Sequence, residues 1–382
     1  MIDGRSIAIA RAPLIAFAAM GVLWGTYAAL IPDIKGALGA SDAVFGRLLL
    51  ATPLSAVVTM LVAPRLAPRF GTHVLPLAVL GLALAYMAPG WQSTPLAFAL
   101  AMLGVGVTNA FLDVTMNARV STLEADRGLE LMNLAHAAYS LAYGAAAVLT
   151  GLARGAGLGP GPILTVAAVT VAVAALAAVE KGPDINGFAR EKGNRTALGM
   201  VPVWGGLMVL IAFMAENAAE NWSALHIERT LGAARGEGSF GPAVLALTMG
   251  AGRLAGQSVI TRIGARSLIG SGTAVAAGGL ALLALAPTPV VAYAGLIVTG
   301  LGGAVLAPTI FALVGRLAAP ERRAGAIARA TAIGYMGFFF GPPALGLLSE
   351  LMGLRAAFMA MAALVLALIA LMPRLLAAGS RS

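Results

Sequence analysis

Twelve apolar runs, each about 20 residues long, divide this chain and limit its fold more than any other feature. A helix of that length is about 30 Å long, which matches the hydrocarbon core of a bilayer. The runs are too long for the roughly ten-residue alternating strands of a membrane barrel. Only 11% of the residues are charged, whereas a soluble domain has about 25%. We therefore expect an all-α integral membrane protein with 12 transmembrane helices.

The predicted spans follow one another with short polar loops between them. The first span comes after Arg5 and Arg11, as the apolar part of a signal peptide would. It is too long for that part and no clear cleavage site follows, so we count it as a helix. The spans are residues 13–31, 46–63, 74–90, 96–117, 132–153, 162–179, 201–224, 242–260, 267–286, 290–315, 326–348 and 354–372.

The longest polar stretch, residues 181–200, separates six spans from the other six. Its Gly, Pro, Asn and charged residues indicate a cytoplasmic linker. It divides an N-terminal six-helix bundle, residues 1–180, from a C-terminal six-helix bundle, residues 201–382. Short motifs recur between the two groups, which indicates two pseudo-symmetric bundles. The recurring residues are Arg69 and Gly71 with Arg262 and Gly264, Gly104 and Gly106 with Gly300 and Gly302, and Tyr139 with Tyr335.

The distribution of basic residues predicts the orientation. An even number of spans puts both termini on one side, and cytoplasmic loops are enriched in Lys and Arg. With the termini in the cytoplasm, 18 basic residues fall in inner segments and 6 in outer loops. We therefore expect a multi-pass protein of the bacterial inner (plasma) membrane with both termini cytoplasmic. The net charge of +9 then reflects topology, and we expect no nucleic-acid partner.

Some kinds of chemistry are disfavoured by absences in the sequence. The chain has no cysteine, so disulfides and thiolate metal sites are impossible. It has no Gly-x-x-x-x-Gly-Lys-Ser/Thr motif for ATP. We expect no metal and no other cofactor.

Two glutamates stand one helical turn apart inside the seventh span. Glu216 and Glu220 project from the same side of a helix, and Asn217 and Asn221 repeat the spacing one position later. Each carboxylate costs about 2.5–3.5 kcal/mol at the bilayer centre on insertion scales. Such a stripe is typical of the wall of a water-filled path, so Glu216 is the first candidate for a proton carrier and Glu220 the third.

Asp113 is the second candidate for a proton carrier. It lies in the fourth span, with Asn109 and Asn117 four residues away on either side, so the three side chains share one face. An alternative is that Asp113 pairs with Arg119 or Arg69 and holds the cytoplasmic gate closed.

Other polar or aromatic side chains are also candidates for solute binding. Spans 3, 6, 9 and 12 hold no charged residue except Arg355 at one edge, so we expect these four helices to lie outside the cavity. The predicted solute-binding residues are Trp24, Tyr27, Asn109, Asn117, His136, Tyr139, Asn217, Asn221, Gln257 and Tyr335.

Several of these residues also have a simpler structural explanation. His136 could bond a neighbouring backbone carbonyl, and Glu220, near the outer end of its span, could be an ordinary solvated acid. Tyr27 could belong to an interfacial aromatic belt. Arg253, one turn before Gln257, could extend its side chain to the membrane surface from a helix end.

The eleventh span contains a sequence that we expect to break its helix. Pro342 and Pro343 lack amide donors, and their rings clash with the preceding turn. Gly337 and Gly341 precede them and permit close approach of a neighbouring helix. A hinge at Gly341 and Pro342 is the functional interpretation, and a static kink is the alternative.

The chain resembles the major facilitator superfamily of transporters over its whole length. The twelve spans, the central linker, the six-plus-six repeat and the Arg-x-Gly loops after spans 2 and 8 all fit that family. The family's loop after span 2 usually reads Gly-x-x-x-Asp-Arg-x-Gly-Arg; here Arg69 and Gly71 match, and Pro68 replaces the acid. The resemblance implies gating roles for Arg69, Gly71, Arg262 and Gly264.

A narrower resemblance is to the YbjJ-like branch, which is similar to fucose permeases. LDVTMNARVSTLE followed by MNLAHAAYSLAYGA resembles its pattern in spans 4 and 5. AENAAENWSAL resembles its pattern in span 7, where Glu216, Trp222 and Ser223 match. YMGFFFGPPALG resembles its span 11. The resemblance implies fold and transport, but no particular solute.

These features predict a secondary transporter that works by alternating access and is not an enzyme. Two six-helix bundles would rock around a midplane site. Its partners would be the bilayer, protons and a small polar solute such as a sugar-like metabolite, and we expect a monomer. Amides and aromatic rings suit an uncharged metabolite.

Other functions stay open at this point. A proton-driven exporter of amphipathic compounds is the closest alternative, although span 5 lacks the Gly-Pro element usual in such exporters. A transporter-shaped receptor would usually add a soluble domain, whereas about ten residues lie outside the spans at each end. A membrane-embedded hydrolase is suggested only by His136 and Ser140 at i and i+4.

Overall fold

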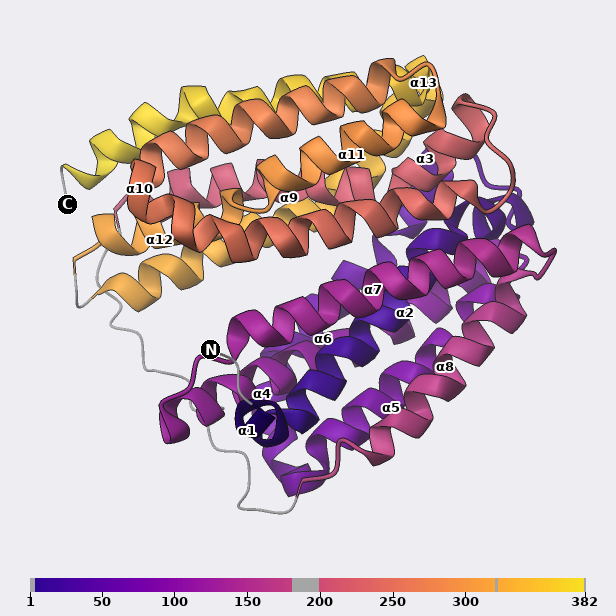
Figure 1. Ribbon diagram of the computed structural model, residues 1–382, viewed down its shortest axis with the longest axis horizontal. Coiled ribbons are helices and arrows are strands. Elements are labelled where there is room, and N and C mark those ends of the chain that lie inside the picture. Colours follow the sequence, from indigo (N-terminus) through magenta and orange to yellow (C-terminus); the bar gives the residue numbers. More distant parts are fainter. Residues whose placement is uncertain (1–3, 181–198, 320–321, 381–382) are drawn as a thin grey trace. The chain divides into compact units, whose positions relative to one another are not determined.

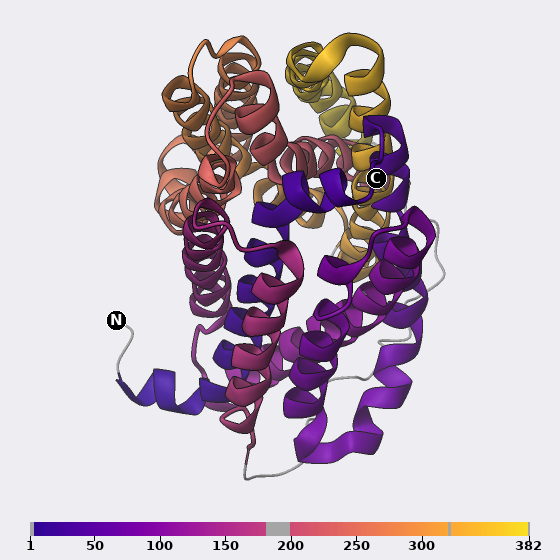
Figure 2. The same ribbon diagram turned by 90° about the vertical axis from the view of Figure 1, so that its right-hand side faces the viewer.

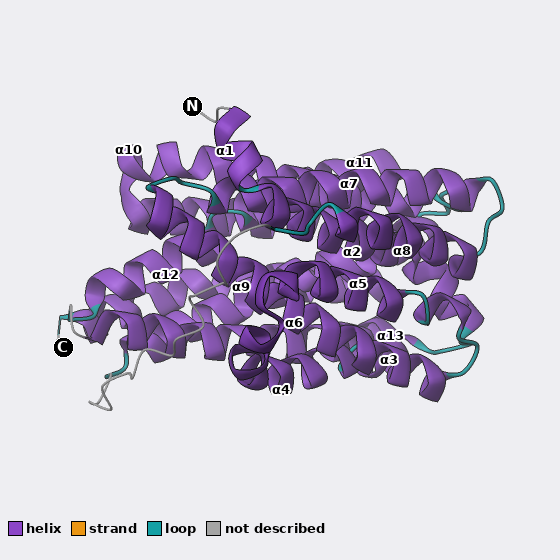
Figure 3. Ribbon diagram, turned by 90° about the horizontal axis from the view of Figure 1, so that it is seen from below, coloured by secondary structure: helices purple, strands orange, loops and turns teal. Residues whose placement is uncertain are grey.

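The computed structural model describes residues 4–180, 199–319 and 322–380, and every regular element in these ranges is a helix (Figures 1 and 3). This confirms the all-α prediction for the part of the chain that the structure describes. The predicted linker at 181–200 lies almost wholly outside the described residues. The helices are α1 (Gly4–Ile9), α2 (Arg11–Ala37), α3 (Asp42–Leu48), α4 (Ala51–Leu66), η1 (Ala67–His73), α5 (Val74–Tyr86), η2 (Pro89–Trp91), α6 (Pro95–Arg127), α7 (Met132–Gly155), α8 (Pro160–Leu176), α9 (Val201–Leu225), η3 (His226–Thr230), η4 (Glu237–Ser239), α10 (Phe240–Leu285), α11 (Pro289–Gly303), α12 (Leu306–Leu317) and α13 (Arg323–Gly379).

Seven helical stretches among the described residues are long and apolar enough to cross a membrane. Two of them, Asp42–Trp91 and Gly325–Gly379, each contain two of the predicted spans. The sixth predicted span corresponds to α8, which is apolar but only 17 residues long. The structure therefore supports a multi-pass membrane protein, and the count of twelve spans stays a prediction.

Glycines with left-handed backbone angles recur at the spacing of the sequence repeat. A positive φ is accessible to glycine at little cost, because glycine has no Cβ atom. The turns after α4 and within α10 contain Gly71 and Gly264, so the paired Arg-x-Gly motifs form turns of the same kind. The pairs are Gly39 (φ 57°) with Gly232 (φ 69°), Gly71 (φ 51°) with Gly264 (φ 77°), and Gly157 (φ 93°) with Gly353 (φ 81°).

The helices form two compact units. Unit 1 comprises Met1–Ser41, Leu48–Arg190 and Ala234–Leu247, and unit 2 comprises Asp42–Arg47, Glu191–Ala233 and Thr248–Ser382. Apart from two short segments, unit 1 comes from the first half of the sequence and unit 2 from the second half. Most of α3 belongs to unit 2, although it comes from the N-terminal half of the sequence. Residues 234–247, which include η4 and the start of α10, belong to unit 1.

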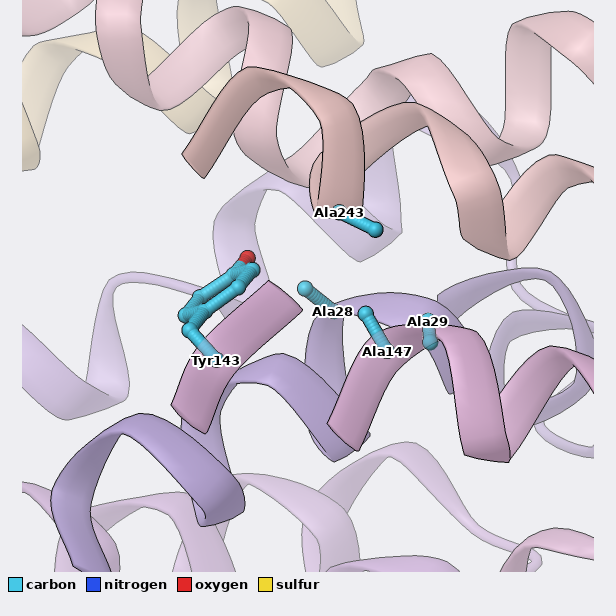
Figure 4. Packing of buried hydrophobic residues seen from close by; sticks show 5 residues of the cluster. All are labelled: Ala28, Ala29, Tyr143, Ala147 and Ala243. Carbon is cyan, nitrogen blue, oxygen red and sulfur yellow. The ribbon is translucent and has the colours of Figure 1, made fainter. Parts of the chain in front are cut away.

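In unit 1, α2 runs alongside α7 and α8 (Figures 1 and 2). A cluster of buried side chains joins α2, α7 and the start of α10: Ala28, Ala29, Tyr143, Ala147 and Ala243 (Figure 4). Small side chains let the backbones approach closely, as is usual between helices in membranes. Trp24 and Tyr139 are partly buried against this cluster.

Gly25 sits where α2 and α7 touch. A Cβ atom there would lie 2.9 Å from both the carbonyl carbon and the Cα of Tyr143, and closer still to its carbonyl oxygen. Because backbone atoms cannot rotate away, Gly25→Ala should push the helices apart and lower the free energy of unfolding by about 1–3 kcal/mol. Thermal unfolding of the purified protein measures this.

Gly36 provides the matched control on the same helix. A Cβ atom at Gly36 would have no neighbour within 4 Å. Gly36→Ala should therefore leave stability unchanged or raise it slightly, since Ala favours helix over Gly by roughly 1 kcal/mol. Equal melting temperatures for the two variants would contradict the close contact at Gly25.

Candidate functional site

Glu216 forms an ion pair with Arg253 within unit 2. Glu216 is on α9, Arg253 is on α10, and Nη2 of Arg253 donates to Oε1 of Glu216 at 3.1 Å. The side chains are 26% and 34% exposed, respectively. The charge of Arg253 is thus balanced by Glu216, an interaction that the sequence did not indicate.

Glu216 lies on the part of α9 that other helices leave incompletely covered. Most of α9 is buried, but Leu210, Phe213, Glu216 and Glu220 are only partly buried. They follow one another at intervals of three or four residues and so form one stripe. A stripe with two carboxylates is expensive against lipid, so we interpret it as a surface that meets water.

An aromatic stack adjoins Glu216 on this stripe. The ring of Phe213, one turn before Glu216, is stacked on Tyr335 at 5.8 Å between centroids and on Phe338 at 4.9 Å. Tyr335 and Phe338 come from α13. All three rings are partly exposed. Tyr335 was predicted as a solute-binding residue, whereas Phe213 and Phe338 were not, because phenylalanine within an apolar run gives no distinguishing signal.

The two asparagines of span 7 are less accessible than their glutamate neighbours. Asn217 and Asn221 are 9% and 5% exposed. The amide of Asn221 donates to the backbone carbonyl of Asn217 at 3.0 Å. Among the described residues, Oδ1 of Asn217 has no hydrogen-bond partner. Asn217 therefore keeps an acceptor for a further donor, whereas the amide of Asn221 is used within its own helix.

Trp24 and Asn109 meet in unit 1. Nε1 of Trp24 donates to Oδ1 of Asn109 at 2.7 Å, which joins α2 to α6. The indole also packs edge-on against Tyr27 and Tyr86, at 5.8 and 6.0 Å between centroids. Tyr27 is fully buried, so it does not belong to an interfacial aromatic belt. Tyr27 packs against the indole of Trp24. Trp24 and Asn109 are partly exposed, so they are better placed than Tyr27 to contact a solute.

Asp113 does not form the predicted charge lock. Its Oδ1 accepts a hydrogen bond from the amide of Asn117 at 3.0 Å. Arg119 instead pairs with Glu180 at 2.8 Å, and Arg69 is exposed. The expectation that Asp113 locks the gate through Arg119 or Arg69 was therefore wrong. The amide of Asn117 is occupied by Asp113, both by its carboxylate and by its backbone carbonyl.

His136 and Tyr139 lie on α7 in unit 1. His136 is exposed and packs edge-on against Phe17 at 5.1 Å between ring centroids. Tyr139 is partly buried, with its ring 5.9 Å from that of Tyr143. The side chain of Gln257 lies outside the described residues.

Among the predicted gating positions, the two glycine turns leave the helical conformation, whereas the proline pair stays inside a helix. Gly71 and Gly264 both adopt non-helical angles, and Arg262, like Arg69, is exposed. The predicted break at Pro342 is wrong, because α13 stays helical through it and is interrupted only at Gly353. Membrane helices tolerate such prolines when neighbouring groups satisfy the freed carbonyls.

A buried charge cluster in unit 1 was not predicted. Arg154, at the end of α7, is 0% exposed and donates from Nε and Nη2 to Asp33 at 3.1 and 2.8 Å. Its Nη1 donates to Ser239 at 2.9 Å. Arg235 also donates to Asp33, at 2.9 Å. The cluster thus ties residues 234–247 to α2 and α7, at the end that topology predicts to be external.

A second cluster stands in unit 2 at the corresponding place in the repeat. Asp42, the first residue of α3, accepts hydrogen bonds from Nη1 and Nη2 of Arg229 and from the hydroxyl of Ser349. The backbone amide of Ala43 donates to Glu350 on α13 at 2.9 Å. Arg154 and Glu350 are 196 residues apart, the same spacing as Tyr139 and Tyr335.

Comparisons with known proteins agree with this architecture. Residues 205–381 match the family model of the Major Facilitator Superfamily. An uncharacterised MFS-type transporter of Yersinia pestis is 26% identical over 346 residues, covering 89% of this chain and 88% of that protein. The membrane protein MosC of Rhizobium meliloti is 26% identical over 343 residues, covering 87% and 82% respectively.

Solved transporters have the same fold. A bacterial homologue of the human lysosomal transporter Spinster, in an inward-facing and occupied conformation, superposes with a TM-score of 0.77 at 14% identity. That match covers 98% of this chain and 97% of the other. A mutant of the nucleoside transporter NupG also gives 0.77, at 15% identity, and covers 96% and 99%. The Yersinia pestis relative and both of these solved proteins are transporters rather than enzymes.

Proposed function

We propose that this chain is a transporter of the major facilitator superfamily, which its relatives and its fold support, and that it moves a small polar solute across the membrane by proton-coupled symport. The observation that carries this proposal is the partly exposed pair of Glu216 and Arg253 on the open stripe of α9. A titratable acid at this depth is rare and is typical of proton pathways in transporters. Glu216 is the proposed proton carrier.

The other acids are less suited to the same task. Asp113 is held by Asn117 on its own helix, which suits a carboxylate that stays in place. Glu220 lies one turn nearer the predicted outer end of α9 than Glu216. We keep Asp113 as the second candidate for the proton carrier and Glu220 as the third.

The proposed solute contacts come from both halves of the sequence. Trp24 and Asn109 offer an indole face and an amide, and Tyr335 offers an aromatic ring. His136 and Tyr139 are further candidates. Such groups suit a polar metabolite, and a sugar-like solute is the first hypothesis, in keeping with the proposed membership of the YbjJ-like branch.

Alternating access requires the two ends of the molecule to open in turn. We propose that the turns at Gly71 and Gly264 act at the cytoplasmic end. The clusters around Asp33 and Asp42 would act at the external end, because each ties together segments from both halves of the sequence. Their release would accompany opening toward the outside.

The charge distribution supports a location for this function. We propose the bacterial inner membrane, with both termini cytoplasmic, because inner segments carry 18 basic residues against 6 in outer loops. We propose a monomer whose partners are the bilayer, protons and the solute.

Replacing Glu216 with Gln should uncouple proton flow from transport. The amide keeps the shape and a hydrogen bond but cannot carry a proton, so pH-driven accumulation should stop while solute exchange down its own gradient continues. The measurement is the internal pH of proteoliposomes after addition of single sugars, sugar acids and other metabolites, followed by uptake of any solute that moves protons. Full gradient-driven accumulation by Glu216→Gln would refute this role of Glu216.

Glu130→Gln is the matched control, because Glu130 is exposed between α6 and α7. It should leave coupling intact. The alternative function, export of amphipathic compounds driven by protons, predicts that tetraphenylphosphonium drives proton movement and that sugars do not.

A further inference from the structure

The ion pair of Glu216 and Arg253 is looser than the other described ion pairs. In each of the others, two guanidinium nitrogens contact the same carboxylate group, whereas Arg253 offers one nitrogen to Glu216 at 3.1 Å. Glu216 is also the most exposed acid among these pairs, at 26%. Two-point pairing adds strength and geometric specificity, so this pair is the easiest to open. The others are Arg119 with Glu180, Arg154 with Asp33, Arg229 with Asp42, and Arg235 with Asp33.

Arg253 has donors to spare. A guanidinium group carries five N–H donors in a planar fork, and in the part of the chain that the structure describes, Arg253 makes a single hydrogen bond. Its side chain is 34% exposed. A second acceptor can therefore approach the fork without displacing backbone or any other described partner.

Charge balance determines what that acceptor should be. With Glu216 ionised, the pair is neutral. Protonation of Glu216 removes the negative charge and leaves Arg253 as an uncompensated cation within the apolar span, which is unfavourable. A solute group with one negative charge restores neutrality. When Glu216 is ionised, its carboxylate already pairs with the guanidinium of Arg253 and would repel the same anion.

No other described charge on the packed helices replaces this partner. Along α13 there is no charged residue from 330 to 349, the stretch that holds the aromatic stack. α11 has no charged residue, and the charged residue of α12 is Arg316, near its end. On α9 itself, Glu220 is a second carboxylate one turn away and would repel an anion. On η3, which follows α9, Glu228 is acidic and Arg229 is already held by Asp42. The positive charge at this place therefore comes from Arg253.

The neighbouring rings indicate the rest of the solute. Phe213, stacked with Tyr335 and Phe338, presents a partly exposed aromatic surface one turn from Glu216. Ring faces bind flat apolar surfaces, including the faces of sugar rings. An organic acid with a ring beside its carboxylate would match both features.

We propose that the solute is a small organic monoanion whose carboxylate binds Arg253 when Glu216 is protonated. This inference rests on the proposed symport function and replaces the uncharged metabolite expected from the amides and aromatic rings. Proton and anion then enter together because each relieves the charge that the other leaves unbalanced. No covalent step is involved.

Binding to the purified full-length protein tests this without any transport assay. The probes are acid and amide pairs of the same shape: benzoate with benzamide, and glucuronate with glucuronamide. Glu216→Gln mimics the protonated state, so at pH 8 at least one acid should raise its melting temperature at about tenfold lower concentration than for the wild type. The corresponding amide should not. Glu216→Gln combined with Arg253→Gln should lose the response.

Wild-type protein supplies a second measurement that does not depend on the variant's folding. Its response to the acid should strengthen as the pH is lowered, because the proposed binding requires a protonated Glu216, while the response of Glu216→Gln should stay nearly constant. Equal responses to acid and amide, no response to any acid, or an acid response that survives loss of Arg253 would overturn the proposal. If an acid binds but moves no protons in proteoliposomes, the symport proposal alone is refuted. If a neutral solute is taken up with protons and no acid binds, only the proposal of an anionic solute is refuted.

Discussion

Replacing Asp33 with Asn should lower the free energy of unfolding by about 3–5 kcal/mol, because it leaves a fully buried arginine without its counter-charge. Arg154 is 0% exposed and directs two of its nitrogens at Asp33. Arg235, the second cation on Asp33, would then repel Arg154 as well. Reversible unfolding in mixed micelles, followed by tryptophan fluorescence, measures the loss.

Two further variants separate this effect from a general loss of charge. Arg235 is 45% exposed, so Arg235→Gln should cost only about 0–1 kcal/mol although it contacts the same carboxylate. Asp33→Asn combined with Arg154→Met should recover much of the stability, because no buried charge then remains. Equal losses for Asp33→Asn and Arg235→Gln would show that burial of Arg154 does not decide the effect.

The sequence predicted the helices well because hydrophobic length is a local property. α2, α6 and α9 begin within two residues of the first, fourth and seventh spans, although α2 and α6 continue six and ten residues beyond the predicted ends. The turns at Gly71 and Gly264 were also predictable, since the repeated Arg-x-Gly motif contains the one residue that tolerates such angles. The solved structures that resemble this chain have the same fold over nearly its whole length.

The partners of the charged residues could not be predicted in the same way. Arg154 and Asp33 are 121 positions apart in the sequence, and nothing local indicates that α2 and α7 bring them together. Arg253 looked like a residue near a helix end for the same reason. Asp113 had arginines nearby in the sequence, but Asn117, one turn away on its own helix, is the partner that it contacts.

The prediction for the proline pair failed for the opposite reason. A strong local rule applied there, but the surrounding structure overrides it. Pro342 and Pro343 would break a helix in water, where freed carbonyls are solvated at once. α13 nevertheless continues through them. A Cβ atom on Gly46 of α3 would lie 2.6 Å from the carbonyl oxygen of Pro342, so the backbone of α13 is in close contact with α3 at this level.

A disulfide between α3 and α13 should stop transport if the proposed external cluster must open. Asp42→Cys with Ser349→Cys places two thiols where the carboxylate and hydroxyl now hydrogen-bond, and the native chain has no cysteine to interfere. A Cβ atom on Gly346 would lie 3.1 Å from Cα of Gly46, so the helices are near enough for the roughly 3.8 Å between Cβ atoms that a disulfide needs.

Oxidised protein should show solute-driven proton flux at background level, and reductant should restore it, because α3 could no longer leave α13. The single-cysteine variants under the same oxidant should transport normally. Undiminished flux through fully cross-linked protein would mean that the cluster around Asp42 is structural and that access alternates without separating these helices.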